Sequence, residues 1–346
     1  MRRKRQTKGG GKKKIFISGV AGFLGSHLAD AMIKEGHEVI GCDNLIGGYI
    51  DNIPEEVDYY QVDCRYLNTM NKLLKGVDIV YHTACTAYEG LSVFSPELIC
   101  QNTYQITAAL ASAAVSQNVK RFVYCSSMAR YGTQDTVPFT EDMIPKPQDP
   151  YGISKYAAEE LLRCLGQVHG MEVVIAVPHN IIGPRQKYDD PYRNVASIMI
   201  NMMLQGRQPM IYGDGEQKRC FSFVQDDIAC LTKLAFQDGL DGEVVNIGPD
   251  EEFVTINELA RVIAGQLDFK LEPVYVKGRP QEVVLATCSA DKARRLLGYR
   301  TEYSLERGIA EMIKYIKDKG PKKFRYHLDL EIVNEKTPDT WKNRMF

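Results

Sequence analysis

The chain has 346 residues, of which 44% are hydrophobic and 25% charged, and its formal net charge is −1. This length can bury a large core in one or two domains, and the near-zero charge gives no indication of nucleic-acid binding. No apolar run approaches the roughly 20 residues that cross a bilayer, and no signal-peptide pattern follows the basic start. The nine cysteines are scattered singly, which is typical of reduced thiols in a cytoplasmic protein without disulfides or a zinc site.

The first half of the chain predicts alternating strands and helices. Residues 1–14 carry eight Lys and Arg side chains and no acid, so we expect a disordered basic tail. An apolar run over Lys14–Gly19 predicts a buried strand, and a helical pattern over Phe23–Lys34 follows. Further strands are expected over Glu38–Asp43, Val77–His82, Arg121–Cys125 and Glu172–Val177, and the clearest helices over Ser95–Gln117 and Tyr151–Val168. This alternation predicts an α/β fold with a doubly wound parallel sheet (Rossmann type) over residues 15–183.

The second half has a looser pattern, which predicts a smaller mixed α/β substrate-binding lobe over residues 184–320. Part of it, about 221–248, is expected to return to the main domain, with Val244–Gly248 in the main sheet. Residues 321–346 are polar and irregular, and both an oligomer-contact extension and a simple tail remain open. Helices are expected near Asn194–Gln205, after Gln225, and near Thr255–Gln266, Ser289–Leu297 and Ser304–Lys317.

A glycine-rich segment, Gly19-x-x-Gly22-x-x-Gly25, lies between the first strand and the first helix, which is the context of a dinucleotide-binding loop. Its glycines allow backbone N–H groups to approach a diphosphate, and the helix N-terminus adds a favourable dipole. Asp43 stands at the end of the second strand, where a carboxylate accepts hydrogen bonds from a ribose diol and repels a 2′-phosphate. Because no arginine follows it directly, we expect NAD and not NADP as the cofactor.

Tyr151 and Lys155 are four residues apart and therefore share one helix face. A tyrosine normally loses its proton near pH 10, but an ammonium and a positive nicotinamide ring both favour the phenolate and lower its pKa. Tyr151 could then accept the proton of an alcohol whose carbon delivers a hydride to NAD. Ser127 follows the strand over Arg121–Cys125 and adds a hydroxyl at its carboxyl end. Together the three side chains predict NAD-dependent catalysis.

From about Ile15 to about Ile316 the sequence resembles the extended short-chain dehydrogenases/reductases of the NAD-dependent nucleotide-sugar epimerase/dehydratase type. The resemblance rests on the glycine loop, on Ser127, Tyr151 and Lys155, and on four further motifs. These are His82-Thr-Ala-Cys85, Asn180-Ile-Ile-Gly-Pro-Arg-Gln186, Gly213-Asp-Gly-Glu-Gln-Lys-Arg219 and Gly278-Arg279-Pro280. The resemblance implies that Ser127, Tyr151 and Lys155 form a catalytic triad.

The same resemblance implies the binding residues. Cofactor contacts are expected from Gly19, Gly22, Phe23, Leu24, Gly25, Asp43, Asn44, Asp63, Cys64, Ala84, Tyr151 and Lys155. Substrate contacts are expected from Met128, Asn180, Arg219, Arg279 and Glu282. The two arginines would hold the diphosphate of a UDP-sugar, since guanidinium groups bind phosphate bidentately. For Met128, simple core packing stays an open alternative.

Two features depart from the family pattern. Dehydratases of the family usually have Asp-Glu after the serine, whereas this chain has Met128 and Ala129, which cannot move protons. A C4 epimerase, which needs no such pair, is therefore the first choice. The loop after His82 carries Cys85 and Glu89, and either could act as a base at C5 of a 4-keto sugar. A C5 epimerase of a 4-keto-6-deoxy UDP-N-acetylhexosamine or an atypical 5,6-dehydratase therefore remains an alternative.

The expected activity is transient C4 oxidation of a UDP-hexose or UDP-N-acetylhexosamine, with NAD bound throughout. The family resemblance also suggests a homodimer and a role in making glycan precursors. The sequence shows no pattern of metal ligands, and neither a nucleic-acid nor a membrane partner is expected. A non-catalytic dinucleotide sensor or scaffold is the alternative from another functional class, although the intact Ser127, Tyr151 and Lys155 set argues against it.

Overall fold

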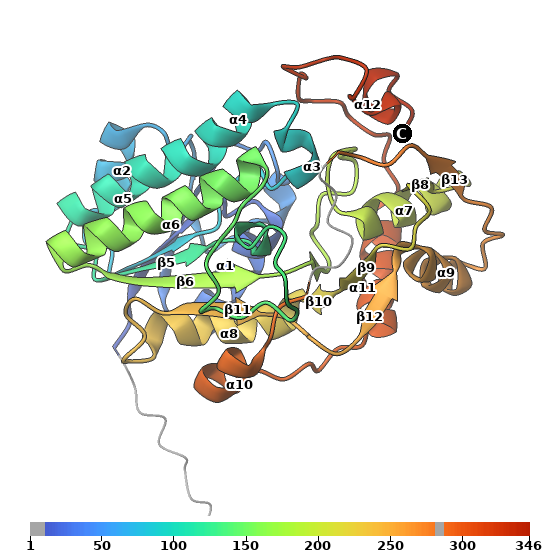
Figure 1. The fold of residues 1–346 in the computed structure, drawn as a ribbon. Helices are drawn as coiled ribbons and strands as arrows, with labels where there is room; N and C mark the ends of the chain where they lie inside the picture. The colour runs from blue at the N-terminus through green and yellow to red at the C-terminus, as the bar shows by residue number, and fades with distance from the viewer. Residues whose placement is uncertain (1–10, 281–286) are drawn as a thin grey trace, which may run out of the picture.

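The computed structural model describes residues 11–280 and 287–346. Its larger part is a parallel seven-stranded sheet with the order β11-β6-β5-β4-β1-β2-β3 (Figure 1). The strands are β1 (Lys14–Ser18), β2 (Glu38–Asp43), β3 (Asp58–Gln61), β4 (Ile79–His82), β5 (Arg121–Cys125), β6 (Glu172–Pro178) and β11 (Val244–Ile247). The chain winds outward from β1 in both directions, so the predicted α/β class and doubly wound sheet are confirmed.

The strand register brings several carboxyl ends to one edge of the sheet. In β1, Ser18 pairs with Cys42 of β2 on one side and with His82 of β4 on the other. His82 also pairs with Tyr124 near the end of β5. The segments that follow β1, β2, β4 and β5 therefore meet at this edge, which is where doubly wound sheets bind ligands.

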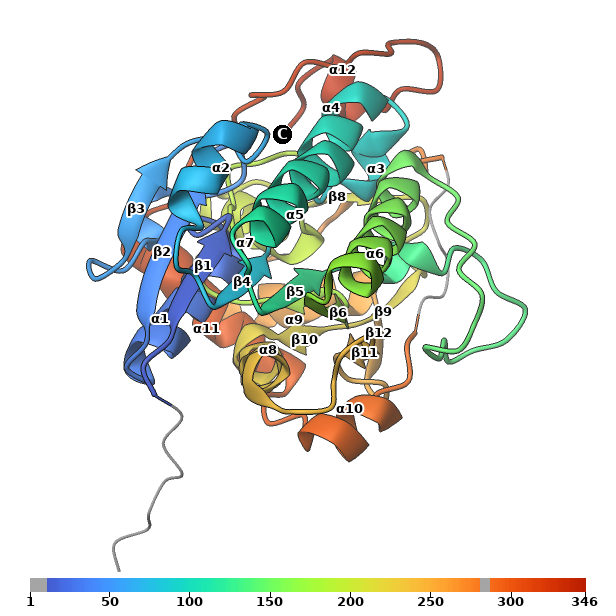
Figure 2. The same ribbon diagram turned by 90° about the vertical axis from the view of Figure 1, so that its left-hand side faces the viewer.

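Helices cover both faces of the sheet (Figure 2). They are α1 (Phe23–Lys34), α2 (Leu67–Leu73), α5 (Ile106–Ser116), α6 (Pro150–His169) and α8 (Val224–Phe236). Neighbouring residues of β1 enter two different cores, because Ile15 and Ile17 pack with α1 and α8, whereas Phe16 packs with α2, α5 and α6. All three side chains are fully buried. This double burial explains why the strand is a continuous apolar run and not an alternating one.

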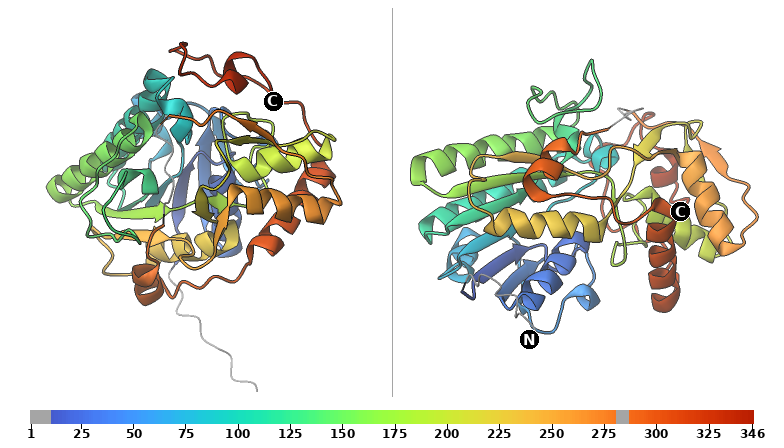
Figure 3. Two further views of the ribbon diagram at one scale, coloured as in Figure 1. Left: turned by 45° about the vertical axis from the view of Figure 1, so that its right-hand side comes forward. Right: turned by 90° about the horizontal axis from the view of Figure 1, so that it is seen from below.

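A second, smaller lobe has its own core and lies beside the sheet (Figure 3). Its helices are α7 (Val195–Leu204), α9 (Ile256–Leu267) and α11 (Leu305–Lys319). Three short strand pairs join them, namely β7 (Ile181–Ile182) with β10 (Ser222–Phe223), β8 (Met210–Tyr212) with β13 (Val274–Val276), and β9 (Lys218–Cys220) with β12 (Phe253–Thr255). Helix α10 (Asp291–Leu297) lies instead on the main domain, where Ala293 and Leu297 are buried against the α8 side of the sheet. This second return to the main domain was not predicted from the sequence.

The helix expected over Ser95–Gln117 is present from Pro96 to Ser116 and contains a π-helical turn. The structure has α4 (Pro96–Cys100), a π-helical turn over Gln101–Gln105, and then α5. The carbonyl oxygen of Asn102, within the π turn, accepts a hydrogen bond from the backbone N–H of Thr86 at 3.3 Å. The π turn thus connects this helix to the loop after β4, and such turns are frequent near functional sites.

The C-terminal segment, residues 321–346, crosses from the second lobe to the main domain and includes the short helix α12 (Asp339–Lys342) (Figure 3). Trp341 is 3% exposed and packs with Tyr88, Phe94 and Tyr192. The segment is therefore a packed part of the fold. Among the described residues, no helix is long and apolar enough to cross a membrane.

Candidate active site

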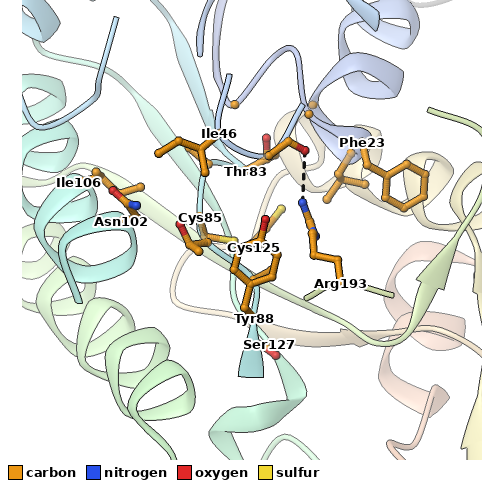
Figure 4. A pocket seen from close by; sticks show the side chains of 18 of the residues that line it. Phe23, Ile46, Thr83, Cys85, Tyr88, Asn102, Ile106, Cys125, Ser127 and Arg193 are labelled. Atoms are coloured by element: carbon orange, nitrogen blue, oxygen red, sulfur yellow. Dashed lines mark hydrogen bonds between the residues drawn. The ribbon is translucent and has the colours of Figure 1, made fainter. Parts of the chain in front are cut away.

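Two adjoining cavities lie at the carboxyl-terminal edge of the sheet. The first cavity has a volume of about 310 Å³ and the second about 290 Å³. Both are lined by Ala87, Glu89, Asn180, Arg193 and Asn194. Figure 4 shows the first cavity, with Cys85, Tyr88, Ser127 and Arg193 around it. Their common wall means that molecules bound in the two cavities would meet.

The first cavity collects most of the site residues predicted from the sequence. They are Gly19, Gly22, Phe23, Leu24, Gly25, Asp43, Asn44, Asp63, Cys64, Ala84, Cys85, Glu89, Ser127, Tyr151, Lys155 and Asn180. Arg219 and Arg279 line the second cavity. Met128 lines neither cavity and packs against the core of the main domain, with its sulfur 4.0 Å from the Asn180 amide nitrogen. Glu282 lies outside the described residues.

The turn between β1 and α1 is shaped to receive a diphosphate. Gly19 has φ +74°, a left-handed conformation that favours glycine. A Cβ atom on Gly25 would lie 2.2 Å from the carbonyl oxygen of Gly19, so this position has no room for a side chain. Helix α1 begins at Phe23 and has no acidic residue in its first turn. The free N–H groups and positive end of α1 therefore face the first cavity, as an anion requires.

Acidic side chains follow β2 and β3 in the same cavity. Asp43 accepts hydrogen bonds from the backbone N–H groups of Ala21 at 3.0 Å and Leu45 at 2.6 Å, which ties its carboxylate to the glycine turn. Burial alone raises the pKa of Asp63, but hydrogen bonds from Arg65 and Asn44 lower it below its usual value. The carboxylates of Asp43 and Asp63 are hydrogen-bond acceptors. They lie at the end of the cavity near β2 and β3, away from β5. They fit the ribose and base of an adenosine.

Local sequence fixes the start of α6 at the predicted catalytic tyrosine. Asp149 caps the helix, and its Oδ1 accepts hydrogen bonds from the N–H groups of Tyr151 at 2.9 Å and Gly152 at 3.0 Å. Pro150 occupies the first turn, where its fixed φ and missing N–H are tolerated. A Cβ atom on Gly152 would lie 2.5 Å from the carbonyl oxygen of Ala129, so glycine allows α6 to approach the turn after Ser127. Tyr151 and Ser127 are thereby brought together.

Lys155 lies beneath Tyr151, one helical turn along α6. It is 1% exposed, and its Nζ donates to the carbonyl oxygen of Cys125 at 2.7 Å and lies 5.9 Å from the centre of the Tyr151 ring. Burial lowers the pKa of Lys155, but Cys85 and Tyr151 raise it by more than burial lowers it. The pKa is therefore above its usual value. The ammonium therefore stays positively charged next to the phenol.

The pKa of Tyr151 is raised, whereas the sequence analysis expected it to fall. Burial raises it most, and Cys85 adds to the rise. The charge of Lys155 and a hydrogen bond with Ser127 lower it, as expected, but do not prevail. The expected fall depended in part on the positive nicotinamide ring, which is not a property of the chain. In the protein alone, Tyr151 is a protonated phenol. Lys155 and Ser127, the two residues that lower its pKa, are already beside it.

Cys85 follows β4, lines the first cavity and raises the pKa of Lys155. It is therefore within the catalytic group and not in a remote core position. Glu89 begins the short helix α3 (Glu89–Ser92) and is exposed to both cavities. The structure places both side chains beside the site, and their chemical role stays a prediction.

The second cavity is lined by groups that suit a nucleotide diphosphate and an aromatic base. The Arg279 guanidinium lies 4.6 Å from the centre of the Tyr212 ring, and a Cβ atom on Gly90 would lie 3.1 Å from its Nη1. Phe221 and Ile256 add apolar surface. Two arginines with an aromatic wall provide charge for phosphates and a stacking surface for a planar ring.

The buried histidines near the site are structural. Burial lowers the pKa of His82 to about 3, so its ring is neutral, and it is held between Ser18 Oγ at 2.6 Å and Thr107 Oγ1 at 2.9 Å. His179 is hydrogen-bonded to the carbonyl oxygen of Pro249 at 2.9 Å. Within residues 11–280 and 287–346, no group of three or more His, Cys, Asp or Glu side chains could hold a metal ion.

Sequence reasoning missed three side chains of the site. Asp149 could have been found, because an acid followed by proline is a common start of a helix. Tyr88 donates to Asp190 at 2.5 Å, a buried pair 102 residues apart in the sequence. Arg193 reaches the first cavity from the segment before α7. The last two depend on contacts between distant segments, which no local pattern indicates.

The sequence matches the model of the NAD dependent epimerase/dehydratase family over residues 15–248. A putative UDP-glucose 4-epimerase of Methanocaldococcus jannaschii is 32% identical over 308 residues, which cover 88% of this chain and 98% of that protein. A UDP-N-acetyl-alpha-D-glucosaminuronate decarboxylase of Bacillus cytotoxicus is 30% identical over 324 residues, which cover 89% of this chain and 98% of that protein.

Solved structures agree with the sequence relatives. UDP-glucose 4-epimerase of Thermotoga maritima, solved with UDP-glucose, superposes with a TM-score of 0.84 and 30% identity, covering 88% of this chain and 99% of that one. UDP-glucuronic acid 4-epimerase of Bacillus cereus, solved with UDP-glucuronic acid and NAD, gives a TM-score of 0.82 and 28% identity, covering 89% and 100%. Together with the glycine turn and the Ser127, Tyr151 and Lys155 group, these matches show that the chain belongs to the NAD-dependent epimerase/dehydratase family.

Proposed function

We propose that this protein is an NAD-dependent nucleotide-sugar 4-epimerase that acts on a UDP-hexose or a UDP-N-acetylhexosamine. The observation that carries this proposal is the position of Tyr151, which lines the first cavity close to the wall shared with the second. A dinucleotide in the first cavity and a sugar nucleotide in the second would meet at its hydroxyl. Several relatives carry the name 4-epimerase, which supports the same reaction.

The side chains divide the acid and base work. Tyr151 accepts the proton of the C4 hydroxyl and later returns it, and Lys155 keeps the phenol polarised by its fixed positive charge. Ser127, which lines the same cavity and lowers the pKa of Tyr151, holds the same hydroxyl in line. NAD, when bound, supplies the acceptor for the hydride of C4 and gives it back to the other face. No further acid or base is needed for this reaction.

The turn after β5 supports epimerisation over water elimination. Met128 and Ala129 lie in a short 3₁₀ helix over Met128–Arg130, where Met128 packs against the core and Ala129 is 8% exposed. A thioether and a methyl group cannot protonate a leaving hydroxyl or take a proton from C5. The 4,6-dehydratase reaction therefore has no acid–base pair at this place.

The second cavity supports a UDP-sugar as the substrate. We infer that Arg219 and Arg279 hold the diphosphate, that Tyr212 and Phe221 border the uracil, and that Asn180 contacts the sugar where the two cavities join. Anchoring the nucleotide leaves the hexose free to turn its other face to the cofactor after oxidation. Candidate substrates differ in the groups that the sugar carries at C2 and C6, so several UDP-sugars have to be compared.

Replacing Tyr151 by Phe tests the proposal. The phenyl ring keeps the shape of the site but cannot carry the C4 proton, so conversion of UDP-glucose, UDP-N-acetylglucosamine or UDP-glucuronic acid to its C4 epimer should fall by about 10³-fold or more. Binding of UDP and of NAD, measured by calorimetry, should be unchanged. Wild-type protein that binds NAD and UDP-sugars but converts none of the panel would support the sensor or scaffold alternative instead.

A second candidate reaction is supported by the position of Cys85, which lines the first cavity and interacts with Lys155. A thiol at this position could remove the C5 proton of a 4-keto sugar, giving C5 epimerisation or an atypical 5,6-dehydration. Incubation in deuterated water separates the candidates. Simple C4 epimerisation leaves C5 unlabelled, whereas deuterium at C5 that disappears in Cys85→Ser or Glu89→Gln would assign the C5 base.

We also propose that the protein forms a homodimer through α5 and α6, which lie side by side on one face of the molecule (Figure 2). Exposed apolar side chains in α6 and in the π turn before α5 support the proposal, namely Ile153 at 51%, Val168 at 69% and Tyr104 at 40%. Helices that expose such residues commonly pack against a second copy. A cytoplasmic location and a role in glycan-precursor synthesis stay predictions of the family resemblance.

A further inference from the structure

Arg193 connects the second lobe with the first cavity. Its neighbour Asn194 caps α7 by accepting a hydrogen bond from Ala196 N at 3.0 Å and donates to the carbonyl oxygen of Ile181 at 3.3 Å. The backbone at this point is thus fixed at the start of a helix of the second lobe. From there the Arg193 side chain points into the first cavity (Figure 4). An arginine of one lobe is therefore presented to the ligand site of the other.

The guanidinium of Arg193 stands beside the glycine turn. Its Nη1 is 3.4 Å from the carbonyl oxygen of Gly47, and a Cβ atom on Gly47 would lie only 3.2 Å from Nη1. The next residue, Gly48, packs directly on the turn, because a Cβ atom there would lie 2.8 Å from the backbone nitrogen of Gly22. Gly22 caps α1. The cation therefore lies near the helix end that would face a diphosphate.

Among the residues that the structure describes, Arg193 forms no close ion pair with a carboxylate, although Asp190 and Asp43 interact with its charge at longer range. Its contacts are the Gly47 carbonyl and the face of the Tyr88 ring, 5.5 Å away. The acid nearest in the chain, Asp190, is already engaged, since it accepts hydrogen bonds from the Tyr88 hydroxyl at 2.5 Å and from Tyr192 N at 2.9 Å. A partly buried guanidinium that no carboxylate contacts directly is stabilised further by an anion that reaches it. This arrangement calls for an anion supplied by a ligand.

Two ligand anions are within the reach of the two cavities, the diphosphate of the cofactor and that of the sugar nucleotide. Arg219 and Arg279 already supply two cations to the second cavity. The contact with Gly47, next to the turn that caps α1, places Arg193 on the cofactor side. We propose that Arg193 binds the diphosphate of NAD and thereby holds the second lobe against the bound cofactor.

This contact has a consequence for the substrate cavity. Asn194, Val195 and Ile198, which follow Arg193, line the second cavity. An arginine fork that grips the cofactor diphosphate fixes the start of α7, and with it one wall of the neighbouring cavity. Bound NAD would then order the sugar-nucleotide site before the sugar arrives. The proposal rests on the cofactor of the family and not on which carbon of the sugar is oxidised.

The test compares NAD affinity in wild-type protein and in Arg193→Met, after removal of any co-purified NAD. Loss of a charged hydrogen-bonding pair should weaken the binding of NAD and of ADP-ribose by about 10- to 100-fold in calorimetry. Adenosine, which lacks the diphosphate, should bind equally to both proteins. UDP binding measured without NAD should be the same in both proteins, whereas bound NAD should strengthen UDP binding only in the wild type. Because no sugar is converted, the result does not depend on the proposed epimerase reaction.

Two further variants make the test decisive. Arg193→Lys keeps the charge but loses the fork, so an intermediate loss of NAD affinity is expected even if the methionine variant folds poorly. Arg185→Gln is the matched control, because it removes the same charge from the same connecting segment but its guanidinium pairs with Asp30 at 2.6 Å. Its NAD affinity should equal that of the wild type. Unchanged NAD affinity in both Arg193 variants, or a selective loss of UDP binding, would overturn the proposal.

Discussion

The cofactor side and the substrate side of this molecule are built in different ways. The first cavity is formed mainly by the turns that directly follow β1, β2, β4 and β5, so each contact is fixed by a strand and the next few residues. The second cavity is assembled from segments far apart in the sequence, from Ala87 to Phe346. The cofactor side is therefore built from local segments, whereas the substrate side depends on long-range packing.

The C-terminal segment shows this difference most clearly. The relatives reported above cover about 88% of this chain but 98–99% of their own length, so part of this chain has no counterpart in them. Residues 321–346 contact both lobes, with Trp341 Nε1 donating to the carbonyl oxygen of Pro191 at 3.3 Å and Tyr212 hydrogen-bonded to Thr340 at 2.5 Å. Phe346 lines the second cavity. The segment thus adds a wall to the substrate side.

The largest effect is expected from Gly25→Ala, which should disrupt the cofactor site and leave the substrate site intact. A Cβ atom in Gly25→Ala would lie 2.2 Å from the carbonyl oxygen of Gly19 and 2.9 Å from Thr83 Oγ1. Such overpacking costs about 1–3 kcal/mol, so NAD affinity should fall by about 10- to 100-fold in calorimetry while UDP affinity is retained. Gly265→Ala, in α9 of the second lobe and with nothing within 4 Å of its Cβ, is the control and should bind NAD normally. Equal affinities in the two variants would contradict the role of the turn.

A pH series tests the buried hydrogen-bond network on the cofactor side. The pKa of His82 is about 3 in the folded protein and near 6.5 when unfolded. Between these values the unfolded chain binds one more proton, so the stability from His82 is full above about pH 6.5 and declines as the pH falls toward 3. The free energy of unfolding should lose about 1.4 kcal/mol per pH unit from this group in that window.

His82→Gln checks this pH dependence. The amide can replace hydrogen bonds to Ser18 and Thr107 but does not titrate, so denaturation by urea between pH 6.5 and pH 4 should show a smaller decrease in stability than in the wild type. His169→Gln, at the exposed end of α6, is the matched control and should keep the wild-type slope. A slope unchanged in His82→Gln would mean that the buried imidazole is protonated in the folded protein.

The smallest expected effect is confined to the substrate side. Glu331 accepts hydrogen bonds from Glu97 N at 2.9 Å and Leu98 N at 2.8 Å, and so caps α4 from the C-terminal segment. Glu331→Ala should cost about 1 kcal/mol of stability and raise the KM for the UDP-sugar, because the wall is loosened, without changing NAD affinity. Glu335→Ala, exposed in the same segment, is the control. A change in NAD affinity would show that the two sides are not separate.

The same contrast explains what could be predicted from the sequence. Alternating strands and helices, the Gly19 turn and the spacing of Tyr151 and Lys155 are local signals, and they predicted the sheet and placed the residues of the first cavity. Arg193, the Tyr88–Asp190 pair and the packing of Trp341 join segments more than 100 residues apart. No periodicity or short motif carries such information, so these parts of the site became visible only in the folded chain.

In the protein alone the pKa of Tyr151 is raised, whereas the expected fall included the charge of a bound nicotinamide ring. The sequence shows the ammonium four residues away but not how deeply the phenol is buried, and burial outweighs the charge of Lys155. The helix expected over Ser95–Gln117 is present, but its π turn over Gln101–Gln105, which contacts Thr86, was not predicted. Neither the burial of Tyr151 nor this turn is indicated by a local sequence pattern.

A UDP-sugar labelled with deuterium at C4 tests transient oxidation at that carbon most directly. Wild-type protein with its own NAD would be incubated in ordinary water with labelled UDP-glucose, and the labelled UDP-N-acetylglucosamine would follow. In the proposed reaction, the C4 hydrogen is transferred as a hydride to NAD and returned to the other face of the sugar without exchange with water. The epimer should therefore retain the deuterium at C4, as measured by NMR. Loss of the label to water during inversion would contradict the account.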